Sequence, residues 1–305
     1  MAFASLKSRQ TRRELKWGLI FITPWILGFL LFHLYPTIAS FYFSFTDKAL
    51  VRPPEFVGFD NYVRLLTRDK QFYKAIGNTL YMVVFAVPLG IVFAFLTALL
   101  LNMKIRGQAI FRTVYYLPTV VPVVAGTLLW LWILNPQYGI MNQGLQSIGL
   151  RSPAWFGSPL WSKPALIMMG LWAVGTSTVL YLAALQGVPQ EMYEAATLDG
   201  AGWWQRTLKI TIPMVSPVTL FIAITSIIGT FQLFTQAYIV GGTGGGANGA
   251  PRESLLFYAI YLYRQGFIYL KMGYASAMAW ILFIIIMVVT LVLMRSSARY
   301  VYYES

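Results

Sequence analysis

Residues 75–103 read AIGNTLYMVVFAVPLGIVFAFLTALLLNM and contain no charged side chain. A helix needs about 20 predominantly apolar residues to cross the hydrocarbon core of a bilayer. Other long charge-free stretches lie at residues 17–46, 113–150, 164–190, 210–251 and 272–294. We expect Asn135–Pro136 and Gly241–Gly242 to shorten the third and fifth to apolar cores near 113–134 and 214–240. The sequence therefore predicts an all-α integral membrane protein with six transmembrane helices.

The composition of the 305 residues agrees with this class. Hydrophobic residues make up 58% and charged residues only 11%, whereas an ordinary soluble domain carries about 25% charged residues. A net charge of +13 would suggest nucleic acid as the partner of a soluble domain. In a membrane protein, basic residues flank the spans and contact anionic headgroups. We therefore expect membrane lipid as a partner and no nucleic acid.

The orientation is predicted from the charges beside the spans. The apolar run from Trp17 past Phe45 is too long for a cleavable signal peptide, so it is expected to stay as a helix. The 23 Lys and Arg residues divide almost evenly between the two sides. However, residues 1–16 and the short turn 102–112 are both strongly basic, and short segments near the first helix carry most weight. We expect a multi-pass protein of a prokaryotic cytoplasmic membrane with both termini in the cytoplasm.

Catalytic chemistry is not expected. No Asp, Glu, Lys or Arg lies within a span, so the sequence offers no intramembrane proton relay. The chain has no Cys, and its one histidine, His33, is interpreted as a packing residue because metal sites need three or four donors. The run GGTGGGANG at 241–249 lacks the Lys of a phosphate loop, since Ala247 follows Gly246. We predict no enzyme activity, no metal site and no cofactor in this chain.

Residues 188–217, VPQEMYEAATLDGAGWWQRTLKITIPMVSP, differ from a generic connector. Glu191, Glu194 and Ala195 fall on one helical face by spacing, and the neighbouring Ala196 keeps the helix thin. Asp199–Gly200 should end that helix, because glycine adopts positive φ without steric cost. Composition alone favours a solvated surface helix on the cytoplasmic side.

The same segment also carries a family resemblance. The run EAATLDGAGWWQRTLKITIP (194–213) resembles the E-A-A…D-G-A…I-x-x-P loop of ABC importer permeases. The matching positions are Glu194, Ala195, Ala196, Asp199, Gly200, Ala201, Ile210 and Pro213. Thr207 stands where a Phe is common, a departure expected to alter packing in the partner's groove. Further stretches look like the carbohydrate-uptake (maltose/multiple-sugar) branch: FVGFDNYVRLL (56–66), Asn78–Thr79, GIMNQGL (139–145), FQLFTQAYIVGGTGG (231–245) and KMGYASAMAWILFIIIMVV (271–289).

The resemblance implies a type I importer permease (MetI-like) fold with a core at 72–294. Residues 1–71 would add a cytoplasmic arm, the first helix and an external loop, and 295–305 would form a cytoplasmic tail. The implied partners are a second homologous permease, two ATPase subunits that hold ATP and Mg, and an extracytoplasmic sugar-binding protein. The implied ATPase-coupling residues are Glu191, Glu194, Ala195, Ala196, Asp199, Gly200 and Ala201. The implied binding-protein contacts are Gly242, Thr243, Gly244 and Gly245.

The substrate is expected to be a sugar or oligosaccharide, because an uncharged path suits a neutral polyol held by aromatic and amide groups. The candidate path residues in the fifth span are Phe231, Gln232, Phe234, Gln236 and Tyr238, with Gln232 and Gln236 on one helical face. Ordinary packing between helices explains each of them equally well. The other functions considered are a glycerol-phosphate or polyol importer permease, a stand-alone secondary carrier, and a membrane scaffold that transports nothing.

Overall fold

The computed structural model describes residues 9–49, 53–103, 106–243 and 253–297. Regular structure in these residues is helical, apart from two isolated β-bridges, Thr46–Phe56 and Ala49–Lys271. The chain divides into two units. One comprises residues 1–68 and 265–280, and the other comprises residues 69–264 and 281–305.

The first unit begins with α1 (Arg9–Phe29), the π-helical turn η2 (Leu30–Leu34) and α2 (Tyr35–Ser44), which together supply the span Arg13–Ser44. It continues with α3 (Asp60–Thr67) and the first turns of α16 (Met272–Ser297). The buried Asn61 joins α3 to the end of α2, because its amide donates to the carbonyls of Ser44 and Thr46 at 3.0 Å each. Gly273 is required here, since a Cβ would overlap the Thr46 carbonyl oxygen.

The second unit contains the remaining helices. They are α4 (Lys70–Asn102), α5 (Gln108–Val120), α6 (Val123–Ile133), α7 (Ile140–Ser147), α8 (Ser162–Trp172), α9 (Gly175–Gln186), α10 (Gln190–Leu198), α11 (Trp203–Arg206), the π-helical turn η3 (Thr207–Thr211), α12 (Ile212–Met214), α13 (Ser216–Phe231), α14 (Thr235–Thr243) and α15 (Tyr258–Tyr263). The second unit also includes the end of α16, from Ile281. A third π-helical turn, η4 (Arg264–Ile268), begins at the last residue of the segment 69–264 and lies mainly in the first unit. These bounds apply to the described ranges alone.

Four helical segments in the described residues are long and apolar enough to span a membrane, and two bent pairs raise the number to six. The six predicted spans are therefore confirmed if each bent pair counts as one span. The apolar core expected near 113–134 is divided between α5 and α6, and the chain bends by 102° between them. Pro118 and Pro122 explain this bend, since each removes a backbone N–H from the helical ladder.

Two further boundaries differ from the expected ones. The pair α8 and α9 is bent by 48° at Ala173–Val174. The fifth span is interrupted at residues 232–234, between α13 and α14. The apolar span ends at Gly242, at the glycine pair expected to end it, and α14 continues one residue further to Thr243. Glycine lowers helix stability by only about 1 kcal/mol relative to alanine, so a packed helix tolerates it.

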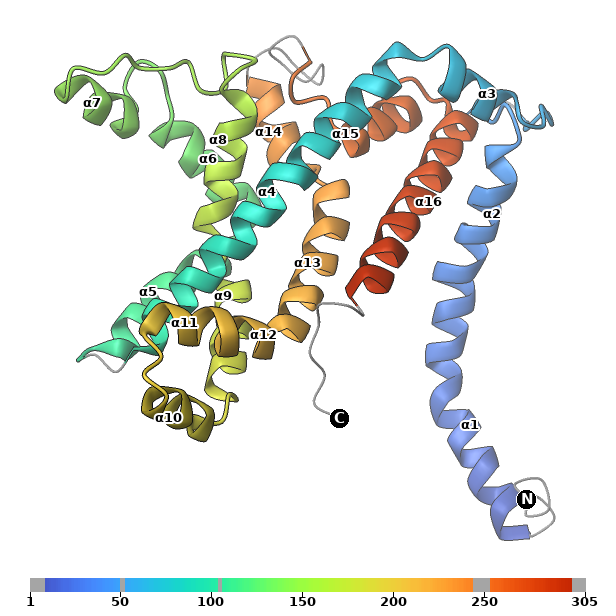
Figure 1. The fold of residues 1–305 in the computed structure, drawn as a ribbon. Coiled ribbons are helices and arrows are strands. Elements are labelled where there is room, and N and C mark those ends of the chain that lie inside the picture. Colours follow the sequence, from blue (N-terminus) through green and yellow to red (C-terminus); the bar gives the residue numbers. More distant parts are fainter. Residues whose placement is uncertain (1–8, 50–52, 104–105, 244–252, 298–305) are drawn as a thin grey trace. The chain divides into compact units, whose positions relative to one another are not determined.

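The core of the second unit lies where α4 packs against α9 and α13, which run beside it in Figure 1. Ala94 and Ala98 on α4 contact a cluster that includes Tyr181 and Leu185 of α9 and Ile222 of α13. Small residues at such contacts let helix backbones approach closely within a membrane. The second half of α16 packs on a neighbouring cluster formed by Val87, Ile227 and Phe231.

A close approach also fixes α9 against α5. Gly175 is buried at the first turn of α9. A Cβ at this position would lie 2.6 Å from Thr119 Cγ2 and 2.8 Å from the carbonyl oxygen of Tyr115. Both distances are too short for any side chain, so this contact between α5 and α9 depends on glycine.

Candidate functional site

The second unit contains a cavity of about 570 Å³ among its spans. Its walls come from α4, α5, α6, α8, α9, α13 and α14. Ligand sites for small molecules commonly measure about 300–1,000 Å³. The cavity is therefore large enough for a small molecule such as a sugar.

Three helix interruptions border this cavity. Val121 lies at the bend between α5 and α6, Val174 lies at the bend between α8 and α9, and Leu233 lies between α13 and α14. All three residues line the cavity wall. Non-helical backbone at membrane depth is tolerated where it is buried in protein or lines a cavity. Discontinuous helices are also a recurring feature of transporter binding sites.

None of the described residues that line the cavity carries a charge. The polar groups on its wall are hydroxyls and one amide, from Thr119, Thr127, Thr176, Ser177, Ser226, Thr230 and Gln236. The indoles of Trp130 and Trp172 also line it and meet edge to face, with ring centroids 6.1 Å apart. Such a wall offers hydrogen bonds and aromatic faces to a neutral polar molecule.

The cavity residues on α13 could have been found from the sequence. Ile222, Ser226, Gly229 and Thr230 recur at the spacing of one helical face. The aromatic and amide side chains at 231–238 suit a sugar better by residue type and were the predicted path residues instead. On α6, the cavity residues recur at the same spacing, at Val123, Gly126, Thr127 and Trp130. The prolines at 118 and 122 indicate the bend that precedes them.

The structure separates the five candidate path residues. Gln236 lines the cavity. Phe231 is buried in the cluster with Val87 and Ile227, and Gln232 is exposed. Phe234 and Tyr238 stack on each other, with centroids 5.1 Å apart, and both rings contact Tyr263. Gln232 and Gln236 do not share a helical face, because residues 232–234 lie outside the helices.

The segment 188–217 folds as a helical hairpin. The predicted end of α10 at Asp199–Gly200 is confirmed, and Gly200 has φ +78°. The amide of Ala201 donates to the carbonyl of Ala196 at 2.9 Å, and that of Gly200 to the carbonyl of Thr197 at 3.0 Å. These two bonds form a Schellman motif, a common helix ending that depends on a left-handed residue. It fixes the corner between α10 and α11.

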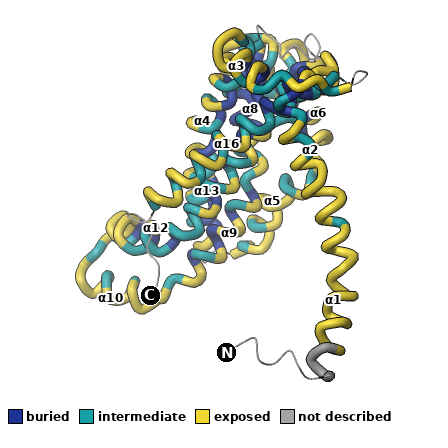
Figure 2. Tube along the Cα trace, turned by 90° about the vertical axis from the view of Figure 1, so that its right-hand side faces the viewer, coloured by how far each residue is buried: buried dark blue, intermediate teal, exposed yellow. Residues whose placement is uncertain are grey.

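The surface of α10 is open to solvent in this chain (Figure 2). Glu191, Glu194, Ala195, Asp199 and Gly200 are exposed, and Ala196 and Ala201 are half-buried. In the described residues, none of these three carboxylates forms an ion pair.

Thr207 lies on the other side of the hairpin. The sequence analysis expected it to alter packing in a partner's groove, but the structure buries it inside the chain. Its hydroxyl donates to the carbonyl of Trp203 at 3.0 Å.

The candidate binding-protein contacts lie at the end of α14. Gly242 is exposed, Thr243 is the last residue of the helix, and Gly244 and Gly245 lie outside the described residues. The chain is described again from Glu253, which has a left-handed backbone with φ 57°. That conformation is uncommon for a residue with a side chain.

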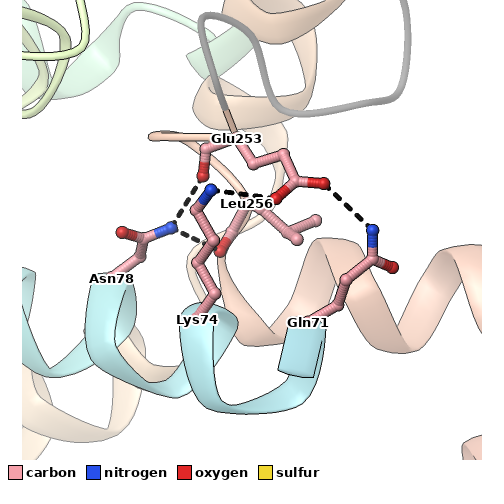
Figure 3. Close-up of polar contacts among 5 residues, drawn as sticks. All are labelled: Gln71, Lys74, Asn78, Glu253 and Leu256. Atoms are coloured by element: carbon pink, nitrogen blue, oxygen red, sulfur yellow. Dashed lines mark hydrogen bonds and ion pairs between the residues drawn. The ribbon is translucent and has the colours of Figure 1, made fainter. Parts of the chain in front are cut away.

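A group of polar side chains on α4 holds the segment that begins at Glu253, as Figure 3 shows. Lys74 pairs with one carboxylate oxygen of Glu253 at 2.9 Å, and Gln71 donates to the other at 2.9 Å. The buried Asn78 donates to the carbonyls of Glu253 and Leu256 at 2.9 and 3.0 Å. The hydrogen bond from Lys74 lowers the pKa of the Glu253 carboxyl. We call Gln71, Lys74, Asn78, Glu253 and Leu256 the loop staple.

Known proteins resemble this chain over nearly all its length. Residues 86–301 match the family described as "Binding-protein-dependent transport system inner membrane component". The probable ABC transporter permease protein YesP of Bacillus subtilis is 37% identical over 306 residues, which cover 100% of this chain and 97% of that protein. The lactose transport system permease protein LacF of Rhizobium radiobacter is 36% identical, with 90% and 91% covered.

A solved structure shares the fold. It is a chain of a bacterial alginate ABC transporter, crystallised in complex with an alginate pentasaccharide-bound periplasmic protein. The TM-score is 0.80 at 24% identity, and the match covers 97% of this chain and 98% of the other.

These similarities define an ABC transporter permease with a MetI-like, all-α membrane fold. The chain belongs to the family of binding-protein-dependent transport system inner membrane components. The predicted fold class and the resemblance to the carbohydrate-uptake branch are both confirmed.

Proposed function

We propose that this chain is the permease subunit of an ATP-driven importer for a neutral sugar or oligosaccharide. The observation that carries the proposal is the uncharged cavity bordered by three helix interruptions. Relatives named for lactose and for arabinooligosaccharides support this substrate class. Hydroxyl groups and Gln236 would bind the sugar hydroxyls, and Trp172 would offer an aromatic face. Phe234 and Tyr238 present a stacked aromatic pair that would also contact the sugar. Phe231 and Gln232 are retained as predicted residues of the substrate path.

The exposed face of α10 would dock on a separate ATPase subunit. Glu191, Glu194 and Ala195 are exposed on it, as a docking surface requires. ATP and Mg would be held by two such ATPase subunits, and this chain would take no catalytic part. Closure of the ATPase dimer would move α10 and switch the cavity between the two sides of the membrane. Nucleotide binding would thereby shift a population between two conformations.

The remaining parts of the proposal concern topology and partners. Residues 72–294 would form the transport core, joined to a second homologous permease. Both termini and α10 would face the cytoplasm. The end of α14 and the Gly-rich sequence that follows it, with Gly242, Thr243, Gly244 and Gly245, would meet an extracytoplasmic sugar-binding protein.

The alternative substrates and mechanisms are less well supported. A glycerol-phosphate site needs basic groups, and no described residue lining the cavity is charged. A stand-alone secondary carrier does not account for the docking-like hairpin at 188–217.

Co-expression with the neighbouring genes tests the function. The tagged chain would be purified in mild detergent, its partners identified by mass spectrometry, and the complex placed in proteoliposomes. We expect an ATPase, a second permease, and ATP-dependent uptake of a neutral oligosaccharide but not of glycerol 3-phosphate. Gln236→Leu should reduce uptake without loss of the partners, whereas Gln146→Ala, at an exposed site on α7, should not.

Two results would overturn the proposal. The first is a chain that is repeatedly recovered alone and takes up solute along an ion gradient. The second is a complex that transports glycerol 3-phosphate in preference to every neutral sugar tested.

A further inference from the structure

The helix α10 is attached to the rest of the chain at few points. It has no buried residue. Within the described ranges, its side chains form hydrogen bonds to later elements only through Tyr193 and Thr197. The Schellman corner at Gly200 fixes the direction of the chain there through two backbone hydrogen bonds, both within residues 196–201.

Both of these side chains bond to the segment that leads into α13. The hydroxyls of Tyr193 and Thr211 share a hydrogen bond of 2.9 Å, and Thr211 is buried in η3. Arg206 donates from Nη1 to the hydroxyl of Thr197 at 3.0 Å. The Thr197 hydroxyl in turn donates to the carbonyl of Tyr193 at 2.6 Å. The four residues therefore form one connected network.

The position of this network suits it to transmit a displacement. Thr211 lies in a π-helical turn, η3, that continues through α12 to the first turn of α13. Such turns are frequent at functional sites. Further along, α13 carries Ile222, Ser226 and Thr230 on the cavity wall. A force on α10 therefore has a side-chain route to a helix that lines the cavity.

We infer that the Tyr193–Thr211 and Arg206–Thr197 hydrogen bonds are the link through which a movement of α10 reaches α13. Tyr193 and Thr211 are then positioning residues for coupling, which neither dock on the ATPase nor touch the substrate. This inference rests on the proposed importer function. It adds that the exposed face of α10 would contact the ATPase, whereas Tyr193 would connect a displacement of α10 to η3 and α13.

The test uses the complex reconstituted with its ATPase and second permease. The chain contains no Cys, so Ser226→Cys on the cavity wall supplies a single labelling site in it. The partners would be made free of reactive cysteines. A charged, water-soluble maleimide reports access to that site, and the ratio of labelling rates with and without ATP measures the switch. ATP hydrolysis and recovery of the partners are measured on the same samples.

The variants isolate the hydroxyl pair. Tyr193→Phe and Thr211→Val each remove one hydroxyl at nearly constant shape. We expect each to bring the labelling ratio about three- to ten-fold closer to one, the factor that a single neutral hydrogen bond supports. ATP hydrolysis and partner recovery should stay at the wild-type level. Thr211→Ser, which keeps the hydroxyl, should restore the wild-type ratio, and the double variant should be no worse than either single variant.

A matched control is Thr67→Val in α3, where the hydroxyl of the exposed threonine donates to the Val63 carbonyl of its own helix and to no other group in the described part of the chain. It should leave the labelling ratio unchanged. Wild-type ratios in both Tyr193→Phe and Thr211→Val would overturn the inference and assign transmission to the main chain. Additive losses in the double variant would also overturn it. If the wild-type complex contains no ATPase or shows no ATP-dependent change in labelling, the proposed function itself fails.

Discussion

Asn78→Ala should loosen the loop staple without disturbing the membrane core. Asn78 lies near the start of α4 and is only 6% exposed. Its amide bonds to two main-chain carbonyls, of Glu253 and Leu256. Each neutral hydrogen bond contributes about 0.5–1.5 kcal/mol, so losing both costs about 1–3 kcal/mol. Since the bonds join only α4 and residues 253–256, the loss should appear as local opening.

Hydrogen exchange detects that opening. The amides of Leu256 and Tyr258 are protected in the folded chain by bonds to the Glu253 carbonyl and the Thr79 hydroxyl. If exchange proceeds through local opening, a loss of about 1–3 kcal/mol accelerates it about 5- to 150-fold. The assay is exchange mass spectrometry on peptides covering residues 253–258, in detergent, for wild type and Asn78→Ala.

The control is a second buried asparagine with the same bonding. Asn61 also donates to two carbonyls, but in the other unit, to Ser44 and Thr46. Asn61→Ala should accelerate exchange near residues 44–46 and leave 253–258 unchanged. Unchanged exchange at 253–258 in Asn78→Ala would refute the reasoning. Equal acceleration of every peptide would show global unfolding and refute it as well.

Three further predictions follow from the geometry. The hydrogen bond from Lys74 lowers the pKa of the Glu253 carboxyl in the folded chain. The ion pair therefore stabilises the fold fully at pH values above the unfolded pKa of the carboxyl. This stabilisation is lost as the pH falls through the lowered pKa of the folded state. The pair is half exposed, so Glu253→Gln should lower stability by only about 0–1 kcal/mol at neutral pH, a difference that shrinks in acid thermal-unfolding scans. Gly175→Ala places a methyl group against α5 and should destabilise the protein by about 1–3 kcal/mol in the same scans. Glu194→Lys, at an exposed site, should abolish coupled uptake while leaving the chain folded and inserted, as proteoliposome transport would show.

Each of these predictions has its own control. For Gly175→Ala it is Gly144→Ala, since a Cβ there meets nothing within 4 Å; equal effects of the two would contradict the close contact. For Glu194→Lys, uptake at the wild-type rate would show that Glu194 is not part of the surface that docks on the ATPase. Gly200→Asp should also uncouple transport, because Gly200 has φ +78°, a conformation that strains a residue with a side chain and would disturb the end of α10. A difference between wild type and Glu253→Gln that grows in acid would contradict the sign of the pKa shift.

The sequence determined the membrane class and the approximate position of every span. The reason is that a hydrocarbon core imposes length and apolarity on any single segment, whatever its neighbours are. It also determined the end of α10 at Asp199–Gly200, because a left-handed helix ending is a local property of glycine.

Only the tertiary structure decided which residues meet. The burial of Phe231 in the core and the hydrogen bond between Tyr193 and Thr211 both depend on packing between separate segments. The same holds for the cavity, where Val121, Val174 and Leu233 come together from three interrupted spans. Apolar periodicity in the sequence indicates that one face of a helix is buried. It does not indicate which other helix covers that face, because hydrophobic and dispersion forces are not directional.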